Sequence, residues 1–572
     1  MSSQTVQSSN RALVLLLAFV VAMLAACDAE RQSEQSQPAK PGKLGLVDFP
    51  TSCSPQAQAH FLRGVAALHS FWYPVALDEF RESTRIEPDC MMGYWGEAMV
   101  HNHPIWGDPQ ETEAARKVLE RIKDTPKLQP REQSWLQSVK VLYGEGDKPA
   151  RDKAYAAAME KIYRDYPEDA EAALFYALSL MGTVRAETPA GLQTRLRAGE
   201  IASEVYKKNP DHPGAAHYVL HAHDDPEHAS LALDAARRYA GIAPEAPHAL
   251  HMPSHIFLQL GMWPEAAASN EASWAASDKW VRQKNLPISK RDYHSLHWLM
   301  YVYLQQGRYG KAEEQLGLMR QSLAGMPKDD PRDLMFGTFT YAQMAATFVV
   351  ETQKWDSMEQ LLGSPQAKAG DAKGQASGIP NQFKAYVVVA QIPAIFARGV
   401  AAAAKSSAEA QKSVAELRAI REQAAGVQEP FVAQVVKMSE VQELEIGAMF
   451  NASKGNFDEA IKTMRKATAL EEAMPPPPGP PTVIKPAHEL FGEILMRAKR
   501  PKEAAEQFAT SLRRHKNRAR SLLGVARAAA ESGGTQGAVK AYAQFTEQWR
   551  QGDAQLPELR EARDYPKQVA AR

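Results

Sequence analysis

The segment Ala57–Cys90, AQAHFLRGVAALHSFWYPVALDEFRESTRIEPDC, contains the pattern that decides the fold. Counted from Ala57, small residues stand at positions 8 and 20 (Gly64 and Ala76), an aromatic residue at position 24 (Phe80) and a proline at position 32 (Pro88). This spacing is typical of two helices that cross closely at small side chains, with a proline just beyond the second helix. The segment therefore predicts a helical hairpin that buries one face against its neighbours.

The same pattern returns along most of the chain. Further copies start at Met91 and Lys485, and the turn pattern Gly-x-aromatic-x-x-Ala begins at Gly261, Gly307 and Gly455. No stretch shows the sustained alternation and β-branched enrichment of a strand. We therefore predict an all-α chain of about eight to ten helical hairpins, stacked as a solenoid (an α-α superhelix) between residues 54 and 565.

These repeats resemble the tetratricopeptide repeat (TPR), a helix–turn–helix unit. The resemblance implies a concave groove lined by positions 2, 5, 9, 12 and 13 of each repeat. Longer strings, such as HPGAAHYVLHAHDDPEHA and APHALHMPSHIF, resemble a group of bacterial exported TPR proteins without an established activity. That second resemblance implies a fold and a location but no reaction.

Seven histidines fall on groove positions of three successive repeats, numbered from Pro213, Pro247 and Tyr293. They are His217 and His221, then His248, His251 and His255, and finally His294 and His297. Spacings of three, four and seven residues place each set on one face of its helix, independently of the resemblance. Because neighbouring helices in such arrays lie about 8–10 Å apart, imidazoles from adjacent helices can reach one ion about 2 Å from each nitrogen.

A transition metal is the preferred ligand for these histidines. Imidazole nitrogens, joined by the carboxylate of Asp224, suit zinc, copper, iron or nickel. Two alternatives stay open: a groove that binds an acidic peptide or a carboxylate ligand, and histidines that only pack. The TPR numbering also places His69, His103 and Tyr301 on groove positions, so we expect these three side chains to face the groove.

The N-terminal residues indicate export. Ala12–Ala26 is an unbroken apolar run, too short to span a membrane but long enough for the core of a signal peptide. It ends in Leu24-Ala25-Ala26-Cys27, which resembles a bacterial lipobox. The resemblance implies a signal peptide over residues 1–26, a lipid on Cys27 and a periplasm-facing protein, at the inner membrane if Asp28 acts as a retention signal.

The sequence also suggests how the mature chain is divided. Residues 27–52 are polar and proline-dotted, which predicts a flexible tether, and the histidine-lined array extends over residues 53–473. The proline run within residues 474–484 predicts a polyproline-like linker, either lying across the groove or only spacing the last repeats. The C-terminal repeats occupy residues 485–565.

Cys53 and Cys90 stand just before and just after the first hairpin. In an antiparallel hairpin these two points lie at the same end, so a disulfide between them is geometrically plausible. An oxidising compartment favours this bond, because no other cysteine remains once Cys27 is lipidated. The alternative is a pair of unbonded thiols.

Composition and missing motifs exclude several function classes. Lys+Arg and Asp+Glu are both 67, and a formal net charge of zero argues against a nucleic-acid binder. The chain has no HExxH, GxSxG or P-loop motif. We therefore favour binding over catalysis: a lipid-anchored envelope protein with a groove-facing polyhistidine site and a peptide or protein partner in the groove.

Two rival functions remain. One is a TPR scaffold for protein–protein interaction without metal. The other is a metal-dependent hydrolase or oxidase, which requires an acid or base beside the histidines. The candidates for that role are Asp224, Asp225, Tyr301 and Glu489.

Overall fold

The computed structural model describes residues 43–105, 110–184, 188–363, 384–425, 427 and 430–571. The signal peptide, Cys27 and Asp28 lie outside these residues. Leu44–Arg572 forms one compact unit. All regular structure in the described ranges is helical, without a strand, which confirms the predicted all-α class.

The helices up to the middle of the chain are α2 (Pro55–His69), α3 (Tyr73–Ile86), α4 (Met91–Val100), α5 (Thr112–Leu119), α6 (Pro130–Leu142), α7 (Lys148–Asp165), α8 (Ala170–Thr183), α9 (Pro189–Lys208), α10 (Pro213–Ala222), α11 (Leu233–Ile242), α12 (Pro247–His251), α13 (Pro253–Gln259) and α14 (Trp263–Gln283). Those that follow are α15 (Tyr293–Gln305), α16 (Tyr309–Ala324), α17 (Pro331–Thr352), α18 (Met358–Leu362), α20 (Lys384–Val389), α21 (Ile392–Ala404), α22 (Glu409–Gln423), α23 (Pro430–Ser453), α24 (Phe457–Glu472), α25 (Ala487–Arg497), α26 (Pro501–Arg514), α27 (Ala519–Glu531), α28 (Thr535–Gln548) and α29 (Pro557–Ala570). Short 3-10 turns cover Ala229–Ala232, Ile288–Lys290 and Trp355–Ser357.

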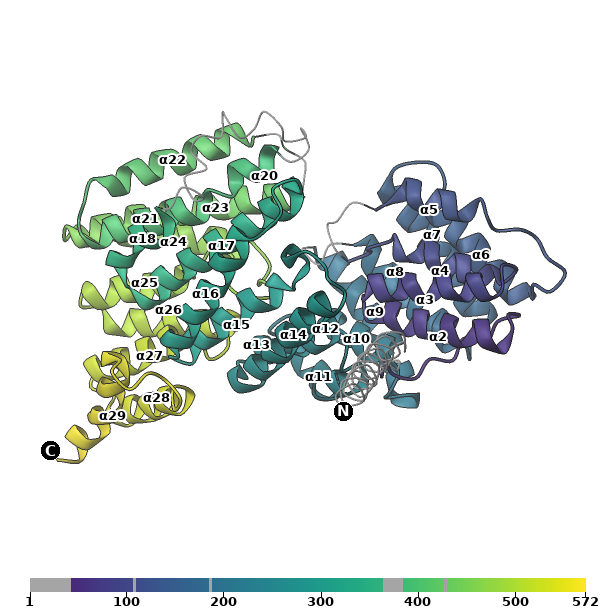
Figure 1. Ribbon diagram of the computed structural model, residues 1–572. Helices are drawn as coiled ribbons and strands as arrows, with labels where there is room; N and C mark the ends of the chain where they lie inside the picture. The colour runs from purple at the N-terminus through teal and green to yellow at the C-terminus, as the bar shows by residue number, and fades with distance from the viewer. Residues whose placement is uncertain are drawn as a thin grey trace, which may run out of the picture. The chain divides into compact units, whose positions relative to one another are not determined.

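Helices that follow one another in sequence pack on one another, as the hairpin pattern predicts. The pairs α2 and α3, α23 and α24, and α27 and α28 are examples, and each pair also contacts the next helix along the chain (Figure 1). The result is a TPR-type solenoid of helical hairpins.

Small residues are required where the first hairpin meets the next helix. A Cβ atom added to Gly64 would lie 2.6 Å from the Phe80 ring, and one added to Gly96 would lie 2.3 Å from the same ring. Phe80 is fully buried. Gly64 and Phe80 therefore mark, in the sequence, the point at which the two helices cross closely.

The N-terminal edge of the compact unit lies earlier than the sequence suggests. We expected a flexible tether through residue 52, but Leu44 and Phe49 are buried and residues 44–52 belong to the compact unit. The Phe49 ring lies 5.2 Å from that of Phe61 and 4.8 Å from that of Trp135. These aromatic contacts hold the segment on the array although it contains no regular structure.

Cys53 and Cys90 form a disulfide, with their Cα atoms 5.0 Å apart. The bond joins the residues before α2 and before α4, so it closes the first hairpin at one end.

One stretch of the described chain, Tyr386–Ala404, is apolar and long enough to cross a membrane by length and composition alone. Most of it, 61%, is buried inside the molecule. This burial is typical of a core helix in a folded domain.

The proline segment, residues 474–484, lies across a cavity rather than only spacing the last repeats. Gln259 at the end of α13 donates a hydrogen bond from Nε2 to the main-chain oxygen of Pro477 (3.0 Å). Arg514 of α26 donates from Nη2 to the oxygen of Met474 (3.0 Å). Val483 and Ile484 are buried at its C-terminal end. The segment is therefore fixed to helices on both sides.

Candidate metal centre

Six of the histidines form two groups of three. The first triad consists of His217 and His221 from α10 and His248 from α12. The second triad consists of His251 from α12, His255 from α13 and His294 from α15. Within each triad, one nitrogen from every ring lies within 4.8 Å of the others. The sequence-predicted histidines thus converge from neighbouring repeats, but on two centres rather than one.

Hydrogen bonds fix the tautomers of two residues in the second triad. Asn270 donates its own amide to the main-chain oxygen of Ala266 (2.8 Å), so its Oδ1 can only accept from His251 Nδ1 (2.7 Å). The carboxylate of Asp224 accepts from His255 Nδ1 (2.6 Å). In the neutral forms of His251 and His255, both protons are therefore on Nδ1, and both Nε2 atoms carry a bare lone pair.

These two bare nitrogens face each other. The distance from His251 Nε2 to His255 Nε2 is 3.1 Å. Two lone pairs at this distance repel unless a proton or a metal cation lies between them. Two nitrogens bound to one tetrahedral zinc ion lie about 3.3 Å apart, given bonds of about 2.0–2.1 Å. The spacing is therefore close to that of a metal-bound pair.

The first triad also contains a pair of facing Nε2 atoms, and the tautomer of one member, His217, is fixed. His217 donates from Nδ1 to the main-chain oxygen of His69 (2.6 Å), which leaves its Nε2 bare and 3.1 Å from Nε2 of His248. Nε2 of His221 is buried without a hydrogen-bond partner. A second ring nitrogen that donates to a carboxylate or a carbonyl is the usual way in which proteins orient a metal-binding imidazole.

Burial favours the neutral form of four of the triad histidines. Burial lowers the pKa of His217 to about 3. Burial, followed by the neighbouring His294 and His255, lowers the pKa of His251 well below its ordinary value. The pKa values of His221 and His248 are also well below 6.5, first because of burial. At neutral pH these rings are therefore ready to donate lone pairs to a cation.

The two triads are adjacent. The ring centres of His221 and His255 lie 6.3 Å apart, and so do those of His248 and His251. Two metal ions, one in each triad, would therefore be bound within one continuous group of six imidazoles.

A third group, made of His69, Glu171 and His212, is a closed hydrogen-bond network. His212 accepts from the main-chain N–H of Gly214 at Nδ1 (3.1 Å), so its Nε2 donates to Glu171 (2.9 Å). His69 contacts Tyr218 with Nδ1 (2.8 Å) and Glu171 with Nε2 (2.6 Å). Although burial raises the pKa of Glu171, His69 and His212 lower it to about 2. Every ring nitrogen is occupied, so the group is structural.

Several expected site residues lie elsewhere. His297 belongs to neither triad, although its Nε2 is buried without a hydrogen-bond partner. Asp224 belongs to neither triad, and its carboxylate accepts a hydrogen bond from His255 Nδ1. His69, expected on the groove surface, is fully buried because Glu171 and Tyr218 satisfy both of its nitrogens. The ring of His103 lies against that of Tyr73, with ring centres 4.6 Å apart.

Tyr301 and Glu489 also differ from expectation, because an arginine holds them in the interior. Arg518, fully buried, donates to Tyr301 Oη (3.0 Å) and to both carboxylate oxygens of Glu489 (2.8 and 3.0 Å). Neither residue is among those that line the cavity beside the triads. Of the four acid–base candidates, only Asp224 and Asp225 border that cavity.

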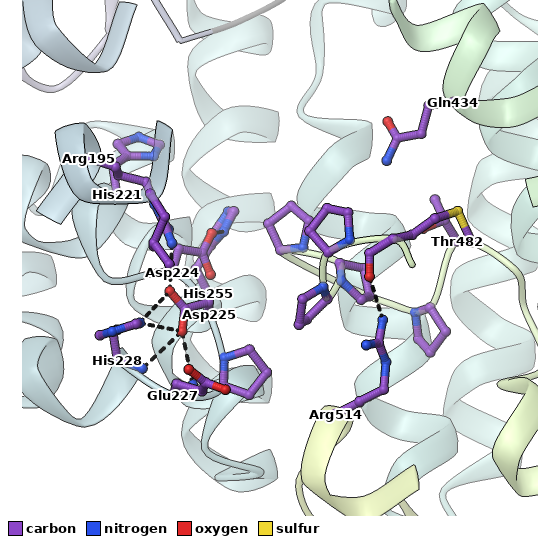
Figure 2. A pocket seen from close by; sticks show the side chains of 18 of the residues that line it. Arg195, His221, Asp224, Asp225, Glu227, His228, His255, Gln434, Thr482 and Arg514 are labelled. Atoms are coloured by element: carbon purple, nitrogen blue, oxygen red, sulfur yellow. Dashed lines mark hydrogen bonds and ion pairs between the residues drawn. The ribbon is translucent and has the colours of Figure 1, made fainter. Parts of the chain in front are cut away.

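A cavity of about 670 Å³ borders both triads. Its lining includes His221 of the first triad and His255 of the second. Figure 2 shows these histidines with Arg195, Asp224 and Asp225 on one side, and Arg514 on the other side. The proline segment faces the histidines across this space.

The sequence did not reveal the residues that orient the histidines. Asn270 lies on α14, nineteen positions after His251, and nothing in its local sequence separates it from an ordinary polar helix residue. Ala266 and Ser273, which lie about one helical turn before and after Asn270, are small and buried. A polar residue on this buried face of the helix is the one feature of the sequence that indicated a role for Asn270. His212 and Glu171 had no recognisable pattern.

Comparison with known proteins adds little to this geometry. No protein-family model matches the chain, and no curated protein matches it either. Similar solved structures include the human IFIT1 dimer with m7Gppp-AAAA (12% identity, 87% of this chain and 91% of that chain, TM-score 0.34). Others are Ypp1 (10%, 89% and 87%, 0.41) and yeast Tom70 (12%, 90% and 96%, 0.26). Similarity at this level carries no information about activity.

Proposed function

We propose that this protein binds transition-metal ions through the two histidine triads. One observation carries the proposal: Nε2 of His251 and Nε2 of His255 face each other at 3.1 Å while both Nδ1 atoms donate to other acceptors. A cation between them relieves the lone-pair repulsion, and the lowered pKa of His251 supports the proposal, because it favours the neutral ring.

The ligand chemistry narrows the choice of metal. All six ligands are imidazoles, and the disulfide-bonded Cys53 and Cys90 are not available as thiolates. Zinc, copper(II) and nickel suit such a site, and so does iron if water or a carboxylate completes its shell. Three imidazoles per ion leave a coordination position for water or for a ligand from the cavity.

The experiment is elemental analysis of the full chain, purified without a histidine tag or chelator. We expect about two metal ions per chain, one for each triad. His255→Ala and His217→Ala should each remove about one ion, whereas His60→Ala, a half-exposed histidine on α2, should remove none. A metal-free parent whose melting temperature does not change on addition of zinc or copper(II) would contradict the proposal.

We also propose that the chain is exported and held at a membrane by a lipid on Cys27. The support is the Leu24-Ala25-Ala26-Cys27 motif after an apolar run, and the Cys53–Cys90 disulfide suits an oxidising compartment. Incorporation of labelled palmitate should occur in the parent and be absent from Cys27→Ser. Equal labelling of both chains would rule out this anchor.

A further inference from the structure

On the histidine side of the cavity beside the triads, both aspartates already have partners. Asp225 accepts from Arg195 Nη2 (2.6 Å) and pairs with His228 (2.8 Å). Asp224 pairs with His255 (2.6 Å). The third acidic residue on this side, Glu227, is exposed to solvent, which screens its charge, so the buried part of this side presents little free negative charge to the cavity.

The opposite side contains a cation without a carboxylate partner. Arg514 makes no ion pair among the described residues, and its Nη2 donates only to the main-chain oxygens of Glu471 (3.1 Å) and Met474 (3.0 Å). These two bonds fix the guanidinium against the proline segment, where Figure 2 shows it facing the cavity. The nearby Glu471 carboxylate accepts its hydrogen bond from the main-chain N–H of Ala487 (2.9 Å) rather than from Arg514.

The polar atoms left unsatisfied around the cavity are all nitrogens. Among the described lining residues, the buried side-chain atoms without a hydrogen-bond partner are Arg195 Nε, His221 Nε2, Arg514 Nε and His515 Nε2. No lining carboxylate or amide oxygen of the described chain is in this state. The Nε–H groups of Arg195 and Arg514 are donors without acceptors, so the cavity is complementary to a ligand that supplies acceptor oxygens.

Much of the remaining lining is apolar. It includes Met181, Leu192, Met438 and Val483, together with the prolines of the proline segment. A volume of about 670 Å³ is also in the range of small-molecule sites rather than of a single ion. The occupant is therefore expected to combine an oxyanion with an apolar body.

We infer that this cavity binds an organic carboxylate, with its head group at Arg514 and its apolar body along the proline segment. The inference goes beyond metal binding, because the contact with Arg514 forms with or without ions in the triads. When the triads are loaded, the same ligand lies within the cavity that borders His221 and His255.

Calorimetric titration of the metal-free full chain tests this inference, with decanoate and 4-phenylbutyrate as probes. We expect at least one probe to bind, and the matching alcohol, decanol or 4-phenylbutanol, to bind about tenfold more weakly or not at all. Arg514→Gln should weaken carboxylate binding by about tenfold or more, and Arg514→Lys, which keeps the charge, should restore part of it. Arg513→Gln is the matched control, because Arg513 is an exposed neighbour on the same helix.

Three results would overturn the inference. They are the absence of binding of both carboxylates, equal binding of acids and alcohols, and equal losses in Arg514→Gln and Arg513→Gln. Unchanged melting temperatures in both glutamine variants would show that any loss comes from the binding site rather than from unfolding. Because metal is absent throughout, the outcome is independent of the metal-binding proposal.

Discussion

At the scale of single residues, the candidate site depends on which ring nitrogen holds each proton. The sequence predicted that histidines from three repeats converge, since helical spacing decides which side chains share a face. It did not predict their tautomers, because the acceptors Asn270 and Asp224 come from other elements. Tertiary packing alone brings these acceptors within hydrogen-bond distance.

Asp224→Ala tests the importance of that orientation. Without the carboxylate, His255 Nδ1 loses its acceptor and the ring is free to rotate or to change tautomer. Loss of such a partner typically lowers metal affinity about 10–100-fold. Competition of the parent and the variant against a chromophoric zinc chelator measures this change, and equal affinities would show that Asp224 does not support the site.

Glu445 gives a prediction about pH and stability. It is fully buried, and neither carboxylate oxygen has a hydrogen-bond partner. Burial, followed by the neighbouring Glu471, raises the pKa of Glu445 well above its ordinary value. The folded state therefore keeps a proton that the unfolded state loses, so this residue makes the protein less stable as the pH rises above its unfolded pKa of about 4.3.

The glutamine side chain of the Glu445→Gln variant cannot ionise. The difference in unfolding free energy between this variant and the parent should therefore change in favour of the variant from pH 5 to pH 8. Denaturant unfolding at the two values measures the difference. Glu440→Gln, an exposed position on the same helix, is the control and should show no such increase. A constant difference between Glu445→Gln and the parent would contradict the assignment.

At the scale of elements, the hairpins were predictable because close crossings leave a residue pattern. The spacing of Gly64 and Phe80 indicates that a glycine and an aromatic ring meet, and the structure shows that contact. Residues 44–52 were not predictable in this way, because they form no regular structure and are held by contacts with residues far away in sequence, such as those of the Phe49 ring with three aromatic rings. The TPR numbering failed at Tyr301 because a buried arginine, rather than the groove, contacts it.

Gly64→Ala tests the crossing. A Cβ atom 2.6 Å from Phe80 must displace the ring or the helix, which is expected to cost about 1–3 kcal/mol despite the better helix propensity of alanine. Gly447→Ala on α23, where nothing lies within 4 Å of the new atom, should instead stabilise the protein by up to about 1 kcal/mol. Equal effects of the two substitutions on the unfolding free energy would refute the packing argument.

At the scale of the whole molecule, a buried charge network joins helices that are far apart in sequence. Arg518 binds Glu489 of α25, Tyr301 of α15 and Glu351 of α17. Lys485 adds a bond to Glu489 (2.9 Å). Sequence patterns gave no hint of this network, because its members lie up to 217 positions apart.

Arg518→Leu should destabilise the protein by about 3–5 kcal/mol, because it leaves Glu351 and Glu489 buried without their main cation. Thermal unfolding measures the loss. The double variant Arg518→Leu/Glu489→Leu should recover part of it, since one of the uncompensated charges is removed. A single variant as stable as the parent would show that the network contributes little.

The most direct test of the central claim is an anomalous difference map at the zinc absorption edge, from crystals of the chain grown with zinc. The account predicts two peaks, one about 2 Å from Nε2 of both His251 and His255, and one beside Nε2 of His217 and His248. A map without a peak at either triad would contradict it.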